Sequence, residues 1–240
     1  MNKVTLVIPI LDEERVLPAL IERIASLDPQ PAEVIAVDGG SSDVSRDIVR
    51  AAGWRLVETS RGRAIQINAG VAAAGSDIVC VLHADTIPPL DAIAVIEAVM
   101  ADRRTALAGF TPLIRGEKIR WGTSFHNWIK TWYAPLLFRP HLFLRGVRLL
   151  FGDHAMFFRR EDFLAIGGCD PGMPVMEDAD LSIKFARLGR VRLVARIVHT
   201  SDRRIAAWGP VKANWIYLKV GAMWAFGARK RLARHYPDIR

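Results

Sequence analysis

The first 100 residues alternate short apolar segments with amphipathic segments of helical period, and this alternation constrains the fold more than any other feature. The apolar segments are rich in Val, Ile and Leu, as expected of strands buried on both faces of a sheet. The alternation is typical of an α/β domain with a mostly parallel central sheet and helices on both faces. We expect strands over residues 4–9, 33–38, 54–58 and 77–82, and helices over 16–27, 44–52, 64–74 and 90–100.

The second half of the chain continues this pattern less regularly. We expect strands over 106–114, 154–160 and 191–199, a short helix over 162–166, a helix ending at Gly189, and a long final helix. At 240 residues and 51% hydrophobic, the chain is long enough for one large α/β domain with an appendage. We predict a domain over residues 1–204, divided into halves at 1–110 and 111–204, and a basic, Trp-rich helical extension over 205–240.

Charge is distributed unevenly along the chain. Residues 1–110 carry 10 Lys and Arg against 15 Asp and Glu, whereas residues 111–240 carry 23 against 10, so the halves are about −5 and +13. Six of the seven Trp also follow residue 120. Basic residues mixed with Trp favour an anionic partner, such as phospholipid headgroups or nucleic acid.

The Trp residues of this basic half leave two interpretations open. Trp121, Trp128 and Trp132 recur at roughly helical spacing, and a basic cluster lies at residues 229–231. They form either a membrane-surface face or a buried packing stripe. No recognised nucleic-acid motif accompanies the charge, so we do not expect nucleic acid as a partner.

The cellular location follows from what the sequence contains. Cys80 and Cys169 have neither a disulfide pattern nor zinc spacing, and are most simply reduced thiols. The N-terminal apolar run is too short for a signal peptide, and no stretch approaches 18 uncharged apolar residues. We therefore expect a cytoplasmic protein, peripheral on the inner face of the cell membrane.

Polar side chains follow the predicted strands at their carboxyl ends, where parallel sheets bind ligands. The first end, PILDEE, lacks the glycines that a dinucleotide site requires, so a Rossmann dinucleotide site is excluded. Asp12 and Glu13 are either ligand-binding residues or helix N-terminal carboxylates. Asp38 ends a buried strand, and Asp43 and its neighbouring serines can cap the next helix without it, so we favour a ligand role for Asp38.

The next two strand ends contain groups that suit a diphosphate and a metal ion. Arg61 and Arg63 precede a helix whose amides, together with the guanidinium groups, suit a diphosphate. Asp85 offers a hard oxygen ligand to a divalent cation. His83 points to the same side if the strand geometry persists, and imidazole suits manganese or zinc better than magnesium. A packed core histidine is the alternative for His83.

Taken together, the motifs resemble the family 2 glycosyltransferases of the GT-A fold, which use nucleotide sugars. The matching segments are VTLVIPILDEE, VDGGSSD, GRAIQINAG, VLHADT and GGCDPGMPVMEDADLSIKFARLGR, in this order over residues 3–204. The chain is most similar to a small bacterial subgroup with His-Ala-Asp in place of Asp-x-Asp and a Thr-Ser-x-Arg-Arg segment, here residues 200–204. The Gln-x-x-Arg-Trp motif of processive synthases is absent, which disfavours a polymerising enzyme.

The resemblance implies a role for each matching residue. It implies a Rossmann-like GT-A domain whose half at 1–110 binds the nucleotide sugar and whose half at 111–204 carries acceptor binding and catalysis. Asp178, beside Glu177, would be the catalytic base, and the metal would be Mn²⁺ or Mg²⁺. The nucleotide-sugar-binding residues that we predict are Pro9, Asp12, Glu13, Asp38, Arg61, Arg63, Asn68, Arg203 and Arg204. The predicted metal ligands are Asp85, His83 and His199, and His83 replaces the family's common aspartate.

The chemistry of sugar transfer requires the same kinds of residues. A departing nucleoside diphosphate leaves negative charge that a metal and Arg63, Arg203 or Arg204 would stabilise. An acceptor hydroxyl must lose a proton to a carboxylate, a role that Asp178 fits, although plain helix N-terminal acidity is the alternative for Glu177 and Asp178.

The predicted function is therefore inverting, metal-dependent transfer of a sugar to an acceptor hydroxyl at the membrane surface, where a lipid-linked acceptor is expected. Inversion follows from the resemblance alone. The alternatives are a sugar nucleotidyltransferase, whose Gly-rich N-terminal loop is missing, and a non-catalytic membrane-associated nucleotide-binding protein.

Overall fold

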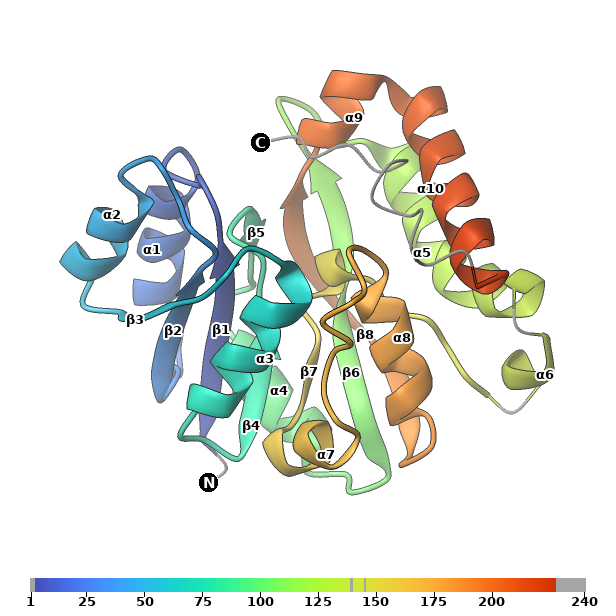
Figure 1. Cartoon of the computed structure of the whole chain (residues 1–240), viewed down its shortest axis with the longest axis horizontal. Helices are drawn as coiled ribbons and strands as arrows, with labels where there is room; N and C mark the ends of the chain where they lie inside the picture. Colours follow the sequence, from blue (N-terminus) through green and yellow to red (C-terminus); the bar gives the residue numbers. More distant parts are fainter. Residues whose placement is uncertain (1–2, 139, 145, 228–240) are drawn as a thin grey trace.

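The computed structural model describes residues 3–138, 140–144 and 146–227, and an eight-stranded sheet forms the centre of this part of the chain (Figure 1). The strands are β1 (Val4–Ile10), β2 (Glu33–Asp38), β3 (Arg55–Glu58), β4 (Ile78–Val81), β5 (Thr86–Ile87), β6 (Thr105–Arg115), β7 (Phe157–Arg159) and β8 (Arg190–Ser201). Their order is β3-β2-β1-β4-β7-β6-β8-β5. Strands β1 to β4 pair in parallel, as do β6 and β8, whereas β5 and β7 pair antiparallel with their neighbours. The predicted mostly parallel sheet is confirmed.

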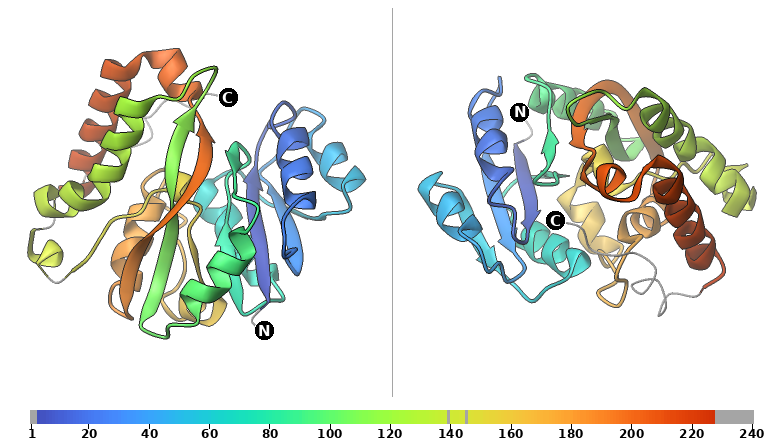
Figure 2. Two further views of the ribbon diagram at one scale, coloured as in Figure 1. Left: turned by 180° about the vertical axis from the view of Figure 1, so that it is seen from behind. Right: turned by 90° about the horizontal axis from the view of Figure 1, so that it is seen from above.

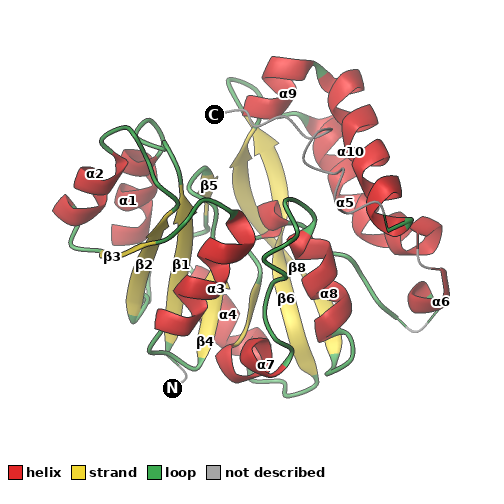
Figure 3. Cartoon of the chain, in the orientation of Figure 1, coloured by secondary structure: helices red, strands yellow, loops and turns green. Residues whose placement is uncertain are grey.

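Helices cover both faces of this sheet, as predicted (Figure 3). The helices are α1 (Leu17–Ala25), α2 (Ser45–Ala51), α3 (Arg63–Ala73), α4 (Ala92–Met100), α5 (Trp121–Phe138), α6 (Pro140–Phe143), α7 (Arg160–Ala165), α8 (Glu177–Phe185), α9 (Arg203–Trp208) and α10 (Pro210–Ala225). Helices α1, α2 and α4 bury their apolar residues in one core, and α3, α7 and α8 bury theirs in a second core on the opposite face. Burial on both faces explains the near-continuous apolar sequence of β1 and β4.

The antiparallel strands bring distant motifs to one edge of the sheet. Thr86 of β5 lies opposite Thr200 of β8, so the loop at residues 83–85 lies beside residues 200–204. Phe157 of β7 lies opposite Cys80 of β4, which places the turn before β7 at the carboxyl end of β4. That turn, Gly152–His154, is a 3₁₀ helix, and the strand predicted over 154–160 is therefore limited to three residues.

The long C-terminal helix that the sequence predicted is two helices. Gly209 separates α9 from α10 with a φ of +77°, a conformation that favours glycine, and Pro210 then begins α10. Helix α10 packs along α5 through Ala134, Val220 and Trp224. The domain boundary at residue 204 falls within α9 and stays a prediction.

Residues 228–240 of the predicted extension, including the basic cluster at 229–231, lie outside the described residues. Across 3–138, 140–144 and 146–227, no helix has both the length and the apolar character needed to cross a bilayer.

Candidate functional site

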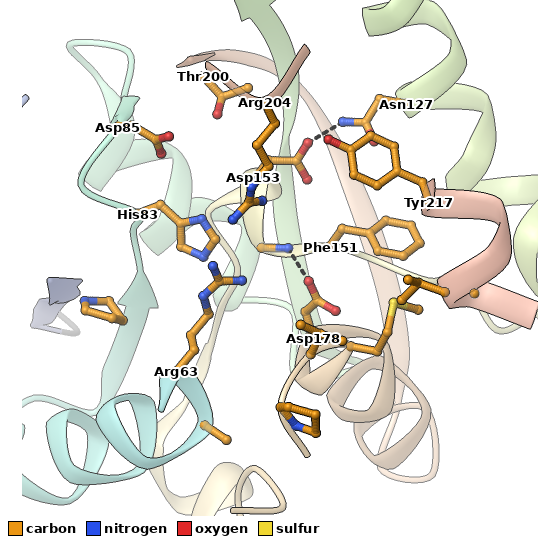
Figure 4. Close-up of a pocket in the computed structure, with 18 of the residues that line it drawn as sticks. Arg63, His83, Asp85, Asn127, Phe151, Asp153, Asp178, Thr200, Arg204 and Tyr217 are labelled. Atoms are coloured by element: carbon orange, nitrogen blue, oxygen red, sulfur yellow. Dashed lines mark hydrogen bonds between the residues drawn. The ribbon is translucent and has the colours of Figure 1, made fainter. Parts of the chain in front are cut away.

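A cavity of about 720 Å³ lies at the carboxyl ends of the strands, between the sheet and helices α5 and α10 (Figure 4). Its walls come from the end of β1, the start of α3, the loop at 83–85, the turn before β7, the start of α8, and residues 200–205. The cavity therefore forms where the topology gathers the strand ends, as expected for an open α/β sheet.

Arg203 joins two of the predicted acidic residues in this cavity. Its Nη1 and Nη2 donate to the two carboxylate oxygens of Glu13, at 2.9 and 3.2 Å, and Nη2 also donates to Oδ2 of Asp85 at 2.8 Å. Arg203 is the first residue of α9, directly after β8, whereas Glu13 follows β1. One guanidinium group thus holds three segments of the chain in a fixed arrangement.

His83 lies at the centre of the cavity, between Asp85 and the acidic end of α8 (Figure 4). A Cβ added at Gly152 would lie 2.6 Å from Nε2 of His83, so the imidazole lies directly against the Gly152 backbone. Burial, reinforced by the positive charge of Arg63, lowers the pKa of His83 to about 3. The ring is therefore neutral at neutral pH and offers an unprotonated nitrogen.

Asp178 lies on the other side of Gly152. The Gly152 amide donates to Oδ2 of Asp178 at 2.6 Å, and the Ala179 amide donates to Oδ1 at 2.6 Å. Burial and the neighbouring Glu177 raise the pKa of Asp178 to about 7, although Arg63 acts in the opposite direction. A carboxyl group of this kind is a suitable general base near neutral pH.

Glu177 is buried beside the cavity and is paired with Arg63. Its side chain is 2% exposed, and Oε1 accepts a hydrogen bond from Nη1 of Arg63 at 3.3 Å. Met176, with a φ of +70°, precedes the helix and turns the chain so that both acidic side chains enter the interior. Solvated helix N-terminal acidity therefore does not account for Glu177 and Asp178.

Asp12 and Asp38 lie outside the cavity lining and join the loops after β1 and β2. Asp38, 1% exposed, accepts hydrogen bonds from the backbone amides of Gly40 and Ser41 at 3.1 Å. Asp12 accepts from the Ser42 amide at 2.7 Å. The role of these carboxylates in nucleotide binding stays a prediction.

Asn68 and His199 also lie away from the cavity lining. The Asn68 amide accepts from the Cys169 backbone N–H and donates to the Cys169 carbonyl, both at 2.9 Å. Thr200 and Ser201 line the cavity, but the preceding His199 does not. The structure does bring together Pro9, Glu13, Arg61, Arg63, His83, Asp85, Asp178, Arg203 and Arg204.

The structure adds cavity residues that sequence analysis missed. Lys130 of α5 lies 3.9 Å from the ring centroid of Phe151 and 5.5 Å from that of Tyr217. Asn127, one turn earlier on α5, donates to the Asp153 carboxylate. The sequence did contain a pattern that predicts these residues: polar residues recur every three or four positions on α5, which indicates a polar face opposite the aromatic one.

Asp85 and His83, the two predicted metal ligands that line the cavity, stay a prediction in that role. Within the described ranges, no group of three or more His, Cys, Asp or Glu side chains is arranged as a metal site. A carboxylate and a neutral imidazole nevertheless form a donor pair that Mn²⁺ accepts, if a bound diphosphate supplies further oxygens. The residues present therefore fit a cation shared between protein and diphosphate.

Comparisons with known sequences identify the family of the chain. The family model described as glycosyl transferase family 2 matches residues 5–167. The undecaprenyl-phosphate 4-deoxy-4-formamido-L-arabinose transferase of Serratia proteamaculans is 36% identical over 104 residues, which cover 39% of this chain and 32% of that protein. The PGL/p-HBAD biosynthesis glycosyltransferase of Mycobacterium bovis is 28% identical over 204 residues, which cover 81% of this chain and 73% of that protein. The match to the Serratia protein thus spans about a third of its length.

Solved structures share the fold. The mannosyltransferase PcManGT of Pyrobaculum calidifontis, in complex with GDP-Man and Mn²⁺, matches with a TM-score of 0.68 and 20% identity over 100% of this chain and 66% of that one. The glucosyl-3-phosphoglycerate synthase of Mycobacterium tuberculosis, in complex with Mg²⁺ and UDP, matches with a TM-score of 0.63 and 19% identity over 94% and 80%.

Proposed function

This chain belongs to glycosyl transferase family 2, and we propose that it moves a sugar from a nucleotide diphosphate sugar to an acceptor hydroxyl, with inversion at the anomeric carbon. The observation that carries this proposal is the position of Asp178: a buried carboxyl group of raised pKa in the same cavity that Arg63, Arg203 and Arg204 line. A base for the acceptor and cations for the leaving group are what such a displacement requires.

The donor's diphosphate would lie against the start of α3 and residues 203–204. Arg63 begins α3, so its guanidinium group, which also pairs with Glu177, and the helix's first amides would contact one anion. Arg203 and Arg204 line the opposite wall. Their positive charge would stabilise the negative charge that develops on the leaving diphosphate.

A divalent cation, Mn²⁺ or Mg²⁺, would be held by Asp85 and His83. It would act as a Lewis acid toward the phosphate oxygens of the leaving group. Two solved structures of the same fold contain Mn²⁺ with GDP-Man and Mg²⁺ with UDP, which supports the same use here. Arg203, which already contacts Asp85, would fix the orientation of that carboxylate.

Asp178 would accept the acceptor's proton. As the acceptor oxygen forms its bond to the anomeric carbon, the bond from that carbon to the diphosphate oxygen breaks, and the hydroxyl proton passes to the Asp178 carboxylate. The two backbone amides that bind Asp178 hold the carboxylate in place for this transfer.

The acceptor would enter from the side of α5 and α10, where the cavity wall becomes apolar. Leu149, Met173, Val220 and Trp224 line this part, close to Asp178. An apolar wall would suit a lipid-linked acceptor, and the name of the Serratia relative includes undecaprenyl phosphate. We therefore propose that the protein works in the cytoplasm, at the inner face of the cell membrane.

A thermal-shift panel tests the donor site first. UDP, GDP, CDP and dTDP are each added with and without Mn²⁺ or Mg²⁺, because a ligand of the folded state raises apparent stability. We expect a shift that requires both a diphosphate and a metal and that is lost in Asp85→Ala. Turnover of the matching nucleotide sugar should then be lost in Asp178→Asn. A shift without turnover would instead indicate a non-catalytic nucleotide-binding protein.

A further inference from the structure

Over much of its length, helix α5 turns polar side chains inward and large apolar side chains outward, which is the reverse of an ordinary surface helix. Ser124, Asn127 and Thr131 are 6%, 5% and 0% exposed. Six of the outward residues lie along one side of the helix, three or four positions apart except for the adjacent Trp128 and Ile129, and are 36–68% exposed: Trp121, Phe125, Trp128, Ile129, Trp132 and Leu136. We call these six residues the α5 stripe.

The α5 stripe is a continuous surface rather than a set of separate side chains. The ring of Trp128 lies 5.9 Å from that of Phe125 and 6.4 Å from that of Trp132, between centroids. Contiguous exposed apolar surface of this kind marks an interaction site in a soluble protein. The buried polar face of the same helix contributes Asn127 to the cavity, so the helix cannot simply rotate to bury its aromatic residues.

An arginine-lined groove begins beside the α5 stripe, at Trp132. The groove runs between α5 and the turn from α8 into β8, and Figure 2 shows α5 beside the β6–β8 pair from behind. Arg148 joins the two surfaces, because its guanidinium carbon lies 4.7 Å from the Trp132 ring centroid. The arginines that line the groove are Arg104, Arg148, Arg187, Arg190 and Arg192.

The groove is strongly cationic. No acidic residue is among the described residues that line it, although Arg104 is paired with Asp102 beside it. Arg187, Arg190 and Arg192 are exposed. Guanidinium groups at this density favour several phosphate groups in a row.

We propose that the α5 stripe and the arginine groove together bind the surface of an anionic phospholipid bilayer. The groove would take headgroup phosphates, and the Trp and Phe rings would enter the boundary between headgroups and acyl chains. A soluble polyanion would leave the stripe exposed, and an apolar protein partner would not require the arginines. A bilayer of net negative charge would contact the α5 stripe and the arginine groove at the same time.

This inference rests on the proposed site of action at the membrane and makes it specific. None of the stripe or groove residues belongs to the proposed donor site, so the diphosphate and metal panel reports on the donor site whether or not the protein binds lipid. The geometry also has a functional consequence: α5 forms a wall of the cavity, and binding through its outer face would bring the cavity to the bilayer.

Vesicle co-sedimentation of the full chain tests the proposal. The vesicles contain phosphatidylcholine alone or phosphatidylcholine mixed with phosphatidylglycerol, at low and high salt. The stripe variant is Trp121→Ser with Trp128→Ser, and the groove variant is Arg187→Gln with Arg190→Gln. The matched controls remove exposed residues from other surfaces: Leu90→Ser with Leu164→Ser, and Arg15→Gln with Arg50→Gln.

We expect binding to the anionic vesicles, weaker at high salt, and little binding to phosphatidylcholine alone. The groove variant should lose about 25-fold in partitioning, at about fivefold per arginine, and the stripe variant at least about tenfold. The two controls should bind like the wild type, and inorganic phosphate should not compete at the same ionic strength.

Three results would overturn the proposal. One is the absence of binding to anionic vesicles at low salt. Another is equal binding by the groove variant and its arginine control. The third is a stripe variant that changes the native mass in light scattering without changing vesicle binding, because the stripe would then be a contact between copies of the chain.

Discussion

His83 and Gly152 are in direct contact at the centre of the cavity, and a Cβ at Gly152 would lie 2.6 Å from Nε2 of the imidazole. The atoms in the way are at the far end of the His83 side chain rather than in the backbone. A methyl group at Gly152 would therefore move His83 without unfolding the turn. The pair offers a way to displace His83 while leaving its chemistry unchanged.

We predict that Gly152→Ala weakens the affinity for Mn²⁺, in the presence of a diphosphate, by about 10- to 100-fold. This is the usual range for a residue that orients a metal ligand. The free energy of unfolding should change by less than about 1 kcal/mol. Titration of Mn²⁺ in the presence of the diphosphate, followed by thermal shift, measures the effect.

Gly122→Ala is the matched control, because a Cβ at Gly122 meets nothing within 4 Å. Gly122 lies on α5, where alanine is the better helix former. Should both variants bind metal equally, His83 would not be a metal ligand.

Arg203 provides a second prediction, because its two carboxylate partners belong to different segments. Replacement by Lys keeps the charge but removes the fork that reaches Glu13 and Asp85 together. We expect Arg203→Lys to reduce the free energy of unfolding by about 1–3 kcal/mol and to weaken donor binding. Arg196→Lys is the control, since its ion pair with Asp91 is exposed and such pairs contribute little. Chemical denaturation of both variants measures the two changes in the free energy of unfolding. Equal losses of stability would show that the Arg203 contacts stabilise the fold no more than an exposed ion pair does.

Much of the architecture was predictable, because buried parallel strands and their covering helices leave strong patterns in a sequence. The apolar runs of β1 and β4 and the helical period of α1 and α4 define elements whose ends fall close to the predicted ones. The GT-A fold and the family are confirmed by the comparisons. The break at Gly209 was missed, because helical periodicity continues across it.

The arrangement of the site was less predictable, because it depends on contacts between distant segments. The contact of His83 with Gly152 depends on the antiparallel insertion of β7 beside β4, which no local pattern encodes. The pairing of Asn68 with Cys169 likewise joins residues 101 positions apart. For α5, the Trp spacing was visible, but only the structure shows that this face is exposed and the polar face is buried.

Asn68 tests whether a residue predicted for the donor site has another role. Its two hydrogen bonds to the Cys169 backbone hold the segment that leads to α8. We predict that Asn68→Ala lowers the free energy of unfolding by about 1–3 kcal/mol, because two backbone groups lose their partner. The Kd for the diphosphate should stay within about twofold of wild type. A large loss of affinity at unchanged stability would restore the predicted donor role.

Asp178 links the proposed chemistry to stability. Its pKa is raised to about 7 in the folded protein from 3.8, so the folded state holds this proton more tightly than the unfolded chain does. The resulting contribution to stability is fully present below about pH 4 and is lost as the pH rises through about 7. Asp178→Asn has no proton to lose, so the stability of the variant relative to wild type should increase between pH 4 and pH 8, by up to about 4 kcal/mol.

Urea denaturation of both proteins across this pH range gives the slope of the free energy of unfolding against pH for each. The difference between the two slopes does not depend on any constant change in stability that the amide causes. Parallel pH profiles for Asp178→Asn and the wild type would mean that Asp178 is ionised well below pH 7. Because a base must be unprotonated to act, the same ionisation should appear as the acidic limb of the turnover profile near pH 7. Agreement between the two measurements would identify one group as both the source of the pH-dependent instability and the base.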